Sequence, residues 1–279
     1  LNVLRVNSSE KVRLVRGSHI VVPKMWSHEK SYFFQGNDGR IIFAIPYETD
    51  FTLIGTTDID HLDINEKPKC TELEKNYLIN FANQYFDPEL KVEDILWTYS
   101  GVRPLQDTSE DNATAVTRDY SVQVNQEDGV PLINVFGGKI TTYRKLAENV
   151  MDEVCLFLPK TRGPWTDKAH LPGGDFAVDG LSELISDLLT AFPFLNAKWA
   201  MRLVKAYGKE TFEMLGSVRN EEELGINFGA TLTQKEVEWL LKEEFATSAE
   251  DILWRRSKLG LRLSELQVKT LQDWIADQN

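Results

Sequence analysis

The sequence predicts an α+β fold in which a mixed or antiparallel sheet is followed by an all-helical part. Short runs rich in β-branched and aromatic residues, bounded by turn residues, dominate the chain up to residue 136. From about residue 175 onward, apolar residues recur at helical spacing. Between the two parts, residues 159–174 hold three prolines and three glycines that interrupt any regular period. We therefore expect a sheet domain over 1–158, a linker over 159–174 and a helical domain over 175–279.

The sheet domain contains seven strand-like runs and two helices. The first helix is opened by Thr71, with Glu74 in the third position of a capping box, and the second is predicted from about residue 142 to 157. Their order does not follow a simple βαβαβ repeat. The predicted strands are 18–22, 32–35, 40–45, 51–56, 95–99, 115–124 and 132–136.

The helical domain carries two further capping-box patterns, Thr233 with Glu236 and Ser264 with Gln267. Ser248 is placed to cap a helix that ends at Gly260. A tryptophan-rich face could dock a partner, but burial in a small bundle is the more common use of large aromatic residues. The expected core residues are Leu184, Leu188, Trp199, Leu203, Trp239, Leu240, Trp254, Leu266 and Trp274.

Composition excludes several classes of function. A hydrophobic share of 42% over 279 residues can supply a proper core. The net charge of -12, with no basic stripe, argues against a nucleic-acid partner. No apolar run approaches the ~20 residues that span a bilayer, so any membrane contact is expected to be peripheral. Cys70 and Cys155 lie far apart, which suits a reducing compartment rather than a disulfide framework. We assign no metal site.

The segment 135–145 combines a strand end, two glycines, a lysine and the start of an amphipathic helix. Gly137 and Gly138 permit positive φ and a close approach to the backbone, and the first helical turn leaves N–H groups unpaired. Lys139 adds a full charge at the same place. The pattern suits an anion or a polar ring edge, although many strand-to-helix turns have similar residues for structural reasons alone.

Four other polar sites interrupt or end strands. A lone His19 is more often structural than catalytic, but its proton exchange would fall near neutral pH. Arg103 and Arg118 would form a phosphate clamp if their strands converge, which the sequence does not show. Gly55 to Asp58 is most simply a turn. The four sites are Arg16-Gly17-Ser18-His19, Tyr99-Ser100-Gly101-Val102-Arg103-Pro104, Thr117-Arg118-Asp119-Tyr120 and Gly55-Thr56-Thr57-Asp58.

In order and spacing, these motifs together resemble the FAD-dependent glycerol-3-phosphate dehydrogenases. The resemblance extends to residues 16–23, to Leu171-Pro172-Gly173-Gly174 and to Trp254-Arg255-Arg256, and so covers nearly the whole chain. The nucleotide-binding Gly-x-Gly-x-x-Gly turn that opens such enzymes does not occur here. The resemblance implies the C-terminal portion of the enzyme: the substrate-binding and closing FAD-binding part of a glutathione-reductase or D-amino-acid-oxidase-like flavoprotein, then a helical domain.

The resemblance also implies an activity and a set of roles. The complete protein would oxidise sn-glycerol 3-phosphate to dihydroxyacetone phosphate, pass a hydride to FAD and deliver electrons to the membrane quinone pool. It would be cytoplasmic and peripherally bound to the cytoplasmic membrane. His19 is the expected base, and Lys139 the second catalytic residue. Arg103 and Arg118 would bind the substrate phosphate. The residues expected at the FAD are Gly101, Gly137, Gly138, Lys139, Ile140 and Thr141.

Two alternatives remain open. A relative with the same substrate residues could instead reduce oxygen and act as a glycerol-3-phosphate oxidase. A second alternative, from a different class, is a non-catalytic module whose helical domain serves homodimerisation or membrane docking. For this chain by itself we expect weak FAD binding and no turnover, because half of the cofactor site would be absent.

Overall fold

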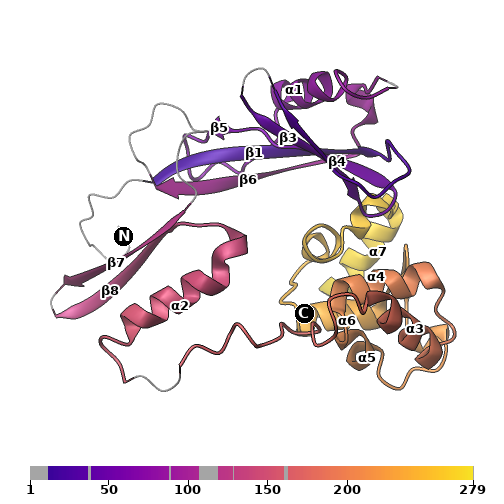
Figure 1. Cartoon of the computed structure of the whole chain (residues 1–279). Helices are drawn as coiled ribbons and strands as arrows, with labels where there is room; N and C mark the ends of the chain where they lie inside the picture. Colours follow the sequence, from indigo (N-terminus) through magenta and orange to yellow (C-terminus); the bar gives the residue numbers. More distant parts are fainter. Residues whose placement is uncertain are drawn as a thin grey trace. The chain divides into compact units, whose positions relative to one another are not determined.

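The chain divides into two compact units, Leu1–Asp167 and Lys168–Asn279. The computed structural model describes residues 12–36, 39–87, 89–106, 119–127, 129–159 and 163–278 (Figure 1). The division falls inside the segment 159–174, where prolines and glycines interrupt regular structure. Strands dominate the first unit and helices the second, which confirms the α+β fold class.

The first unit is built on an antiparallel six-stranded sheet with β1 at its centre. Strand β6 pairs with one edge of β1, while β4 and β5 pair in succession with the other edge, and β3 and β2 continue beyond β4. Ile20, Val21 and Val22 are completely buried, as expected for a central strand covered on both faces. The strands are β1 (Val12–Pro23), β2 (Tyr32–Gln35), β3 (Ile41–Tyr47), β4 (Phe51–Gly55), β5 (Ile59–Asp60) and β6 (Trp97–Gln106).

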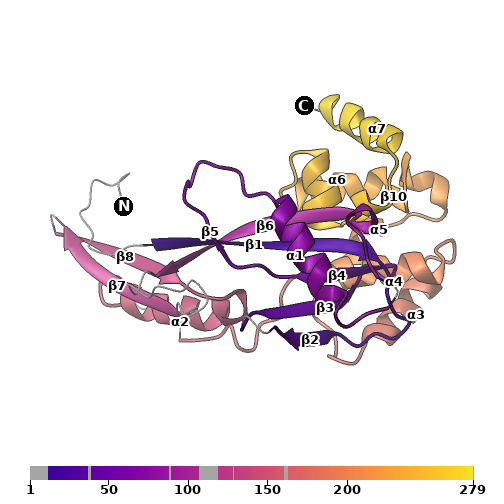
Figure 2. The same ribbon diagram turned by 90° about the horizontal axis from the view of Figure 1, so that it is seen from above.

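Helix α1 (Glu72–Ala82) lies across one face of this sheet, which we call the back face (Figure 2). Apolar residues at alternate strand positions meet one stripe of the helix and form the core between the two layers. The predicted capping box of Thr71 and Glu74 is confirmed. The buried members of this core are Ile20, Val22, Ile42, Ala44, Ile54, Leu78, Ile79, Phe81 and Ala82.

Strands β1 and β6 extend well beyond the ranges predicted for them. The polar and glycine residues at 16–19 and 99–104 break the apolar pattern in the sequence, yet they pair along the middle of both strands. The backbone pairing of the two strands therefore continues although the side chains change from apolar to polar. We call the opposite face of the sheet, away from α1, the front face. Gly17 and the side chains of His19 and Arg103 lie on it.

A separate hairpin and helix complete the first unit. Strands β7 (Tyr120–Glu127) and β8 (Val130–Gly137) pair along their whole length, and a 3-10 turn over Ile140–Thr142 leads into α2 (Tyr143–Val154). Asn149 on α2 donates to the Tyr120 hydroxyl at 2.6 Å, which ties the helix to the hairpin.

The second unit is a helical bundle with one short hairpin. Five of the residues predicted to form its core are buried, namely Leu184, Leu188, Trp199, Leu203 and Leu240, while Trp239, Trp254 and Trp274 pack against it partly exposed. Its elements are α3 (Leu181–Ala191), α4 (Ala197–Tyr207), α5 (Glu210–Leu215), β9 (Asn227–Gly229), β10 (Leu232–Thr233), α6 (Gln234–Lys242), a π-helical segment Asp251–Arg256 and α7 (Glu265–Ala276).

Three predictions about this unit were wrong, and two capping predictions were confirmed. Leu266 is 74% exposed, because it lies on the outer side of the first turn of α7. Ser248 does cap the next helical segment, since its hydroxyl accepts from the Asp251 N–H at 3.2 Å, but that segment ends at Arg256 rather than at Gly260. Thr233 makes no capping bond to α6, so the box with Glu236 does not form. The box of Ser264 and Gln267 at the start of α7 does form.

Two global properties follow from the described part of the chain. None of its helices has the length and apolar character that a bilayer-spanning segment requires. Cys70 and Cys155 are thiols and form no disulfide.

Candidate active site

Strands β1 and β6 bring His19 and Arg103 to the front face. Their antiparallel register pairs Val15 with Arg103, Gly17 with Gly101, and His19 with Tyr99. Because side chains alternate between faces along a strand, these three pairs share one face. In this register the pair of Gly17 and Gly101 therefore comes between the other two pairs, and the sheet surface at Gly101 is bare, since a Cβ there would meet no atom within 4 Å.

The Arg103 guanidinium lies directly over Gly17. A Cβ at position 17 would be 2.5 Å from the Nη2 atom of Arg103, so the arginine can take this position only because residue 17 is glycine. Arg103 Nη1 donates to Asp58 Oδ1 at 2.8 Å, and Nη2 donates to the Thr56 hydroxyl at 3.3 Å. Each nitrogen carries a second hydrogen, so the held guanidinium can also donate to a phosphate oxygen.

The His19 imidazole is packed between a glycine and an aromatic ring. A Cβ at Gly55 would collide with the ring at Cδ2, and the other neighbour is Tyr99, which stacks at 4.8 Å between centroids with an interplanar angle of 5°. The buried His19 Nδ1 atom has no hydrogen-bond partner among the described residues. An orphaned buried polar atom of this kind suits a group that meets its partner only when a ligand is bound.

The environment of His19 keeps its imidazole neutral. Burial, and secondarily the positive charge of Arg103, lower the pKa of His19 from 6.5 to about 4. At neutral pH the ring therefore carries one nitrogen lone pair that can accept a proton. Burial also raises the pKa of the neighbouring Tyr99, so its hydroxyl remains protonated.

The residues expected at the flavin lie on the β8–α2 connection. Gly137 and Gly138 have φ values of 71° and 107°, which confirms that this turn needs glycine, and a Cβ at Gly137 would be 2.6 Å from the carbonyl oxygen of Asp119. The N–H groups of Ile140 and Thr141 donate to no other described residue. Half-buried glycines with positive φ, beside unpaired donors, fit the edge of an electron-rich ring such as the isoalloxazine of FAD.

Lys139 lies on this same turn, half exposed, with its Nζ atom 3.8 Å from Asp119 Oδ1. The structure thus joins His19 to Arg103 on one sheet face, whereas the contact of Lys139 in the described residues is with Asp119. Arg118, the second arginine predicted to bind phosphate, lies outside the described residues. No group of three His, Cys, Asp or Glu side chains within the described ranges is placed to hold a metal ion.

Thr56 and Asp58 are site residues that the sequence pattern did not identify. The segment Gly55–Asp58 is among the polar sites of the sequence and its pattern predicts a turn, yet it extends from the end of β4 past Arg103 and supplies both partners of the guanidinium. The available signal was the run of polar residues directly after a buried strand, a place where side chains from neighbouring strands often meet.

The chain matches the FAD dependent oxidoreductase family over residues 2–144 and the C-terminal domain of alpha-glycerophosphate oxidase over residues 164–276. It is 42% identical over its whole length to D-erythritol 1-phosphate dehydrogenase of Brucella abortus. It is 41% identical over 99% of its length to a glycerol-3-phosphate dehydrogenase of Pseudomonas aeruginosa, and 38% over 95% to the aerobic enzyme of Escherichia coli. It spans about half the length of these relatives, namely 55%, 54% and 53%.

The fold matches a solved glycerol-3-phosphate dehydrogenase from Bacillus halodurans complexed with FAD. The TM-score is 0.74 at 24% identity, covering 98% of this chain and 58% of that one. These findings confirm the resemblance drawn from the motifs and the flavoprotein fold that it implied. The chain belongs to the FAD dependent oxidoreductase family.

Proposed function

We propose that the whole protein oxidises the secondary alcohol of glycerol 3-phosphate and yields dihydroxyacetone phosphate. One observation carries this proposal: a neutral, partly buried imidazole and a guanidinium held over Gly17 by Asp58 lie on the same sheet face, beside the open position of Gly101. A phosphorylated alcohol needs a proton acceptor at one end and a charged donor at the other.

Each residue has one step in this reaction. Arg103 donates hydrogen bonds to the phosphate and so fixes the position of the reacting carbon. An imidazole nitrogen of His19 takes the hydroxyl proton as the C–H hydrogen leaves with its electron pair and the C–O bond becomes a carbonyl. When bound, FAD accepts that hydride. Lys139, with the N–H groups of Ile140 and Thr141, stabilises negative charge at the ring edge. Gly101, Gly137 and Gly138 let the ring approach the backbone, and Arg118 is proposed as a second phosphate ligand.

Replacement of Arg103 and His19 in the whole protein tests these roles. Arg103→Ala should raise KM for glycerol 3-phosphate, with a loss of about 2–3 kcal/mol of binding, since a charged hydrogen bond is removed. His19→Ala should lower kcat by about 10²-fold or more at neutral pH, because the proton acceptor is gone. Anaerobic bleaching of the flavin by substrate is the measurement. Unchanged kinetics in either variant would remove that residue from the site.

D-erythritol 1-phosphate is a second candidate substrate, and the relative of that name from Brucella abortus supports it. Gly101 is exposed, and a Cβ there would meet no atom within 4 Å, so the front face has room for one more carbon with its hydroxyl. The ratio of kcat/KM for the two polyol phosphates decides between them. If kcat/KM for D-erythritol 1-phosphate were far above that for glycerol 3-phosphate, the erythritol ester would be the substrate instead.

The proposed electron acceptor is the quinone pool of the cytoplasmic membrane, to which the whole protein would bind peripherally from the cytoplasm, as a monomer or a homodimer. The match of residues 164–276 to a domain named for an oxidase keeps oxygen as the competing acceptor. Stoichiometric hydrogen peroxide during turnover would favour oxygen, whereas anaerobic reduction of a soluble quinone favours the dehydrogenase.

We also propose that the chain by itself binds FAD weakly and does not turn over substrate, since its relatives are almost twice as long. Titration of the purified chain with FAD, followed by flavin fluorescence, tests this. Purification of the chain with stoichiometric yellow flavin would contradict it.

A further inference from the structure

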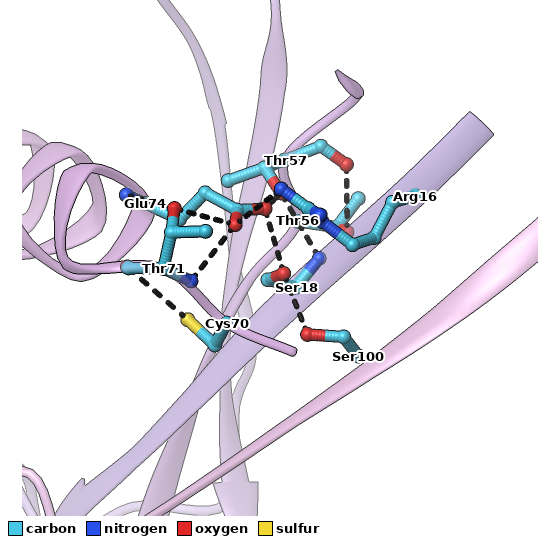
Figure 3. Close-up of polar contacts among 8 residues, drawn as sticks. All are labelled: Arg16, Ser18, Thr56, Thr57, Cys70, Thr71, Glu74 and Ser100. Carbon is cyan, nitrogen blue, oxygen red and sulfur yellow. Dashed lines mark hydrogen bonds and ion pairs between the residues drawn. The ribbon is translucent and has the colours of Figure 1, made fainter. Parts of the chain in front are cut away.

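A buried carboxylate, Glu74, lies on the back face of the sheet, behind the candidate site. Glu74 is the third residue of α1 and is 1% exposed. Its two oxygens receive hydrogen bonds from the helix cap, from β1 and from the segment after β4 (Figure 3). Burial raises the pKa of Glu74, but hydrogen bonds from Ser18, Thr71 and Thr57 outweigh this effect and keep the pKa below its usual value.

The two oxygens of Glu74 have different partners. Oε2 accepts from the Thr71 backbone N–H at 3.0 Å, from the Thr71 hydroxyl at 2.8 Å and from Arg16 at 3.0 Å. Oε1 accepts from the Ser18 and Thr57 hydroxyls, each at 2.7 Å. The first oxygen therefore completes the helix cap, and the second connects the helix to two segments of the sheet unit.

Those two segments are also joined to each other. The Thr57 hydroxyl accepts from the Ser18 backbone N–H at 3.0 Å, and the Thr57 N–H donates to the Ser18 carbonyl at 3.4 Å. The Ser18 hydroxyl is 2.7 Å from that of Ser100 on β6, so the network reaches the strand that carries Arg103 as well. Ser18 and Thr57 are 0% and 1% exposed, which keeps water away from these bonds.

Alternation of side chains connects this network to the front face. Ser18 points back to Glu74, so its neighbours Gly17 and His19 point forward. In the same way Thr57 points back, and its neighbours Thr56 and Asp58 make the two contacts with the Arg103 guanidinium. Along the chain, Ser18 and Thr57 on the back face thus alternate with the residues that form the candidate site on the front face.

We infer that Glu74 is a positioning residue, which through Thr57 and Ser18 fixes the place of the Arg103 guanidinium and thereby sets the affinity for the substrate phosphate. The inference rests on the proposed function. It extends the candidate site through the thickness of the sheet, to a residue that touches neither substrate nor flavin.

Because the two oxygens have separate partners, positioning can be tested apart from capping. In the whole protein, Thr57→Val keeps the shape of the side chain but removes the hydroxyl, whereas Thr57→Ser keeps the hydroxyl. We expect Thr57→Val to raise KM for glycerol 3-phosphate, and the inhibition constant for inorganic phosphate, by about ten-fold with a much smaller change in kcat. Thr57→Ser should restore both constants to within about two-fold of the unchanged protein.

Thr71→Val is the matched control, since it removes a hydroxyl bond to the other oxygen of the same carboxylate. It should lower the melting temperature without a change in KM. Ser18→Ala is a second test that removes the other Oε1 donor, and it should raise KM in the same direction as Thr57→Val, which keeps the inference testable if that variant does not fold.

The outcomes separate the two proposals. If the unchanged protein does not oxidise either polyol phosphate, the proposed function fails. If it does, and Thr57→Val and Ser18→Ala leave both KM and phosphate inhibition unchanged, the positioning role is wrong. An equal rise in KM for Thr71→Val would also overturn it, because the effect would then follow from loss of stability.

Discussion

The two units use the same local sequence pattern in different ways. Thr71 with Glu74 and Thr233 with Glu236 both place a threonine before a helix and a glutamate at its third position, and both carboxylates are almost completely buried. In the sheet unit the capping box closes. In the helical unit Glu236 instead accepts two hydrogen bonds from Arg202, at 2.7 and 2.6 Å, and one from Tyr207 at 2.8 Å.

The difference follows from what lies opposite each helix terminus. Glu74 faces the Ser18 and Thr57 hydroxyls and only one nitrogen of Arg16, which leave it able to accept from its own N-cap as well. Glu236 faces a guanidinium on α4, whose bidentate geometry takes both oxygens. The pattern therefore predicts where a helix begins, whereas the tertiary partner decides which bonds its glutamate makes.

The largest expected effect comes from removing Glu236. Glu236→Ala leaves the largely buried guanidinium of Arg202 without its carboxylate, and should destabilise the helical unit by about 3 kcal/mol. Amide hydrogen exchange in α4 and α6 measures this for that unit alone. The double variant Arg202→Met, Glu236→Leu should recover most of the loss, since a charge pair replaced by apolar residues is often neutral. A double variant as unstable as the single one would show that packing, rather than the lost charge, is responsible.

Removing Glu74 should cost less. Glu74→Ala leaves three hydroxyls, which can find other partners, and removes one hydrogen bond of Arg16, so the sheet unit should lose about 2–3 kcal/mol. Exchange of amides in α1 and in β1 near Ser18 should accelerate, whereas those in α6 should not change. If Glu74→Ala proved more destabilising than Glu236→Ala, our contrast between a single bond from Arg16 and the bidentate pair with Arg202 would be wrong.

Acid should unfold the sheet unit through two groups in succession. His19 has a folded pKa of about 4, below 6.5, so the unfolded chain binds the proton more readily and stability falls as pH drops from 6.5 to 4. Glu74, whose folded pKa is also lowered, adds a further loss below its unfolded value of 4.5. The His19 contribution should be on the order of 3 kcal/mol.

Urea unfolding of the sheet unit at a series of pH values measures this dependence. His19→Gln should flatten the curve between pH 6.5 and 4 while leaving the loss at lower pH. Arg103→Gln should raise the pKa of His19, although not to 6.5, because burial remains. The ring proton resonance of His19 in NMR measures this pKa. A titration of His19 near 6.5 in the unchanged protein would contradict the assigned environment.

The smallest expected effect separates the two threonines. Thr71→Val removes a capping acceptor and should cost about 1 kcal/mol, whereas Thr233→Val removes no capping bond and should change stability by less than about 0.5 kcal/mol. Thermal unfolding of each unit provides the measurement. Equal losses at the two positions would mean that a cap forms at α6 in solution.

Local chemistry made much of the fold predictable. Periodicity gave the order of strands and helices, glycine chemistry gave the positive φ values at Gly137 and Gly138, and the capping patterns at Thr71 and Ser264 gave two helix starts. The same local signals made the predicted ranges of β1 and β6 too short, because the residues that form the candidate site break the apolar alternation by which strands are recognised.

The amino-acid sequence by itself determined the α+β class, the helix starts and the motifs that identify the family, because each depends on residues close together along the chain. Only the tertiary structure decided that Asp58 and Thr56 hold Arg103 and that Glu74 binds Ser18. These partners are 45, 47 and 56 residues apart. Which of them meet depends on strand register and on the face each side chain takes, and a shift of one residue in β1 or β6 would turn Ser18 or Arg103 to the opposite face.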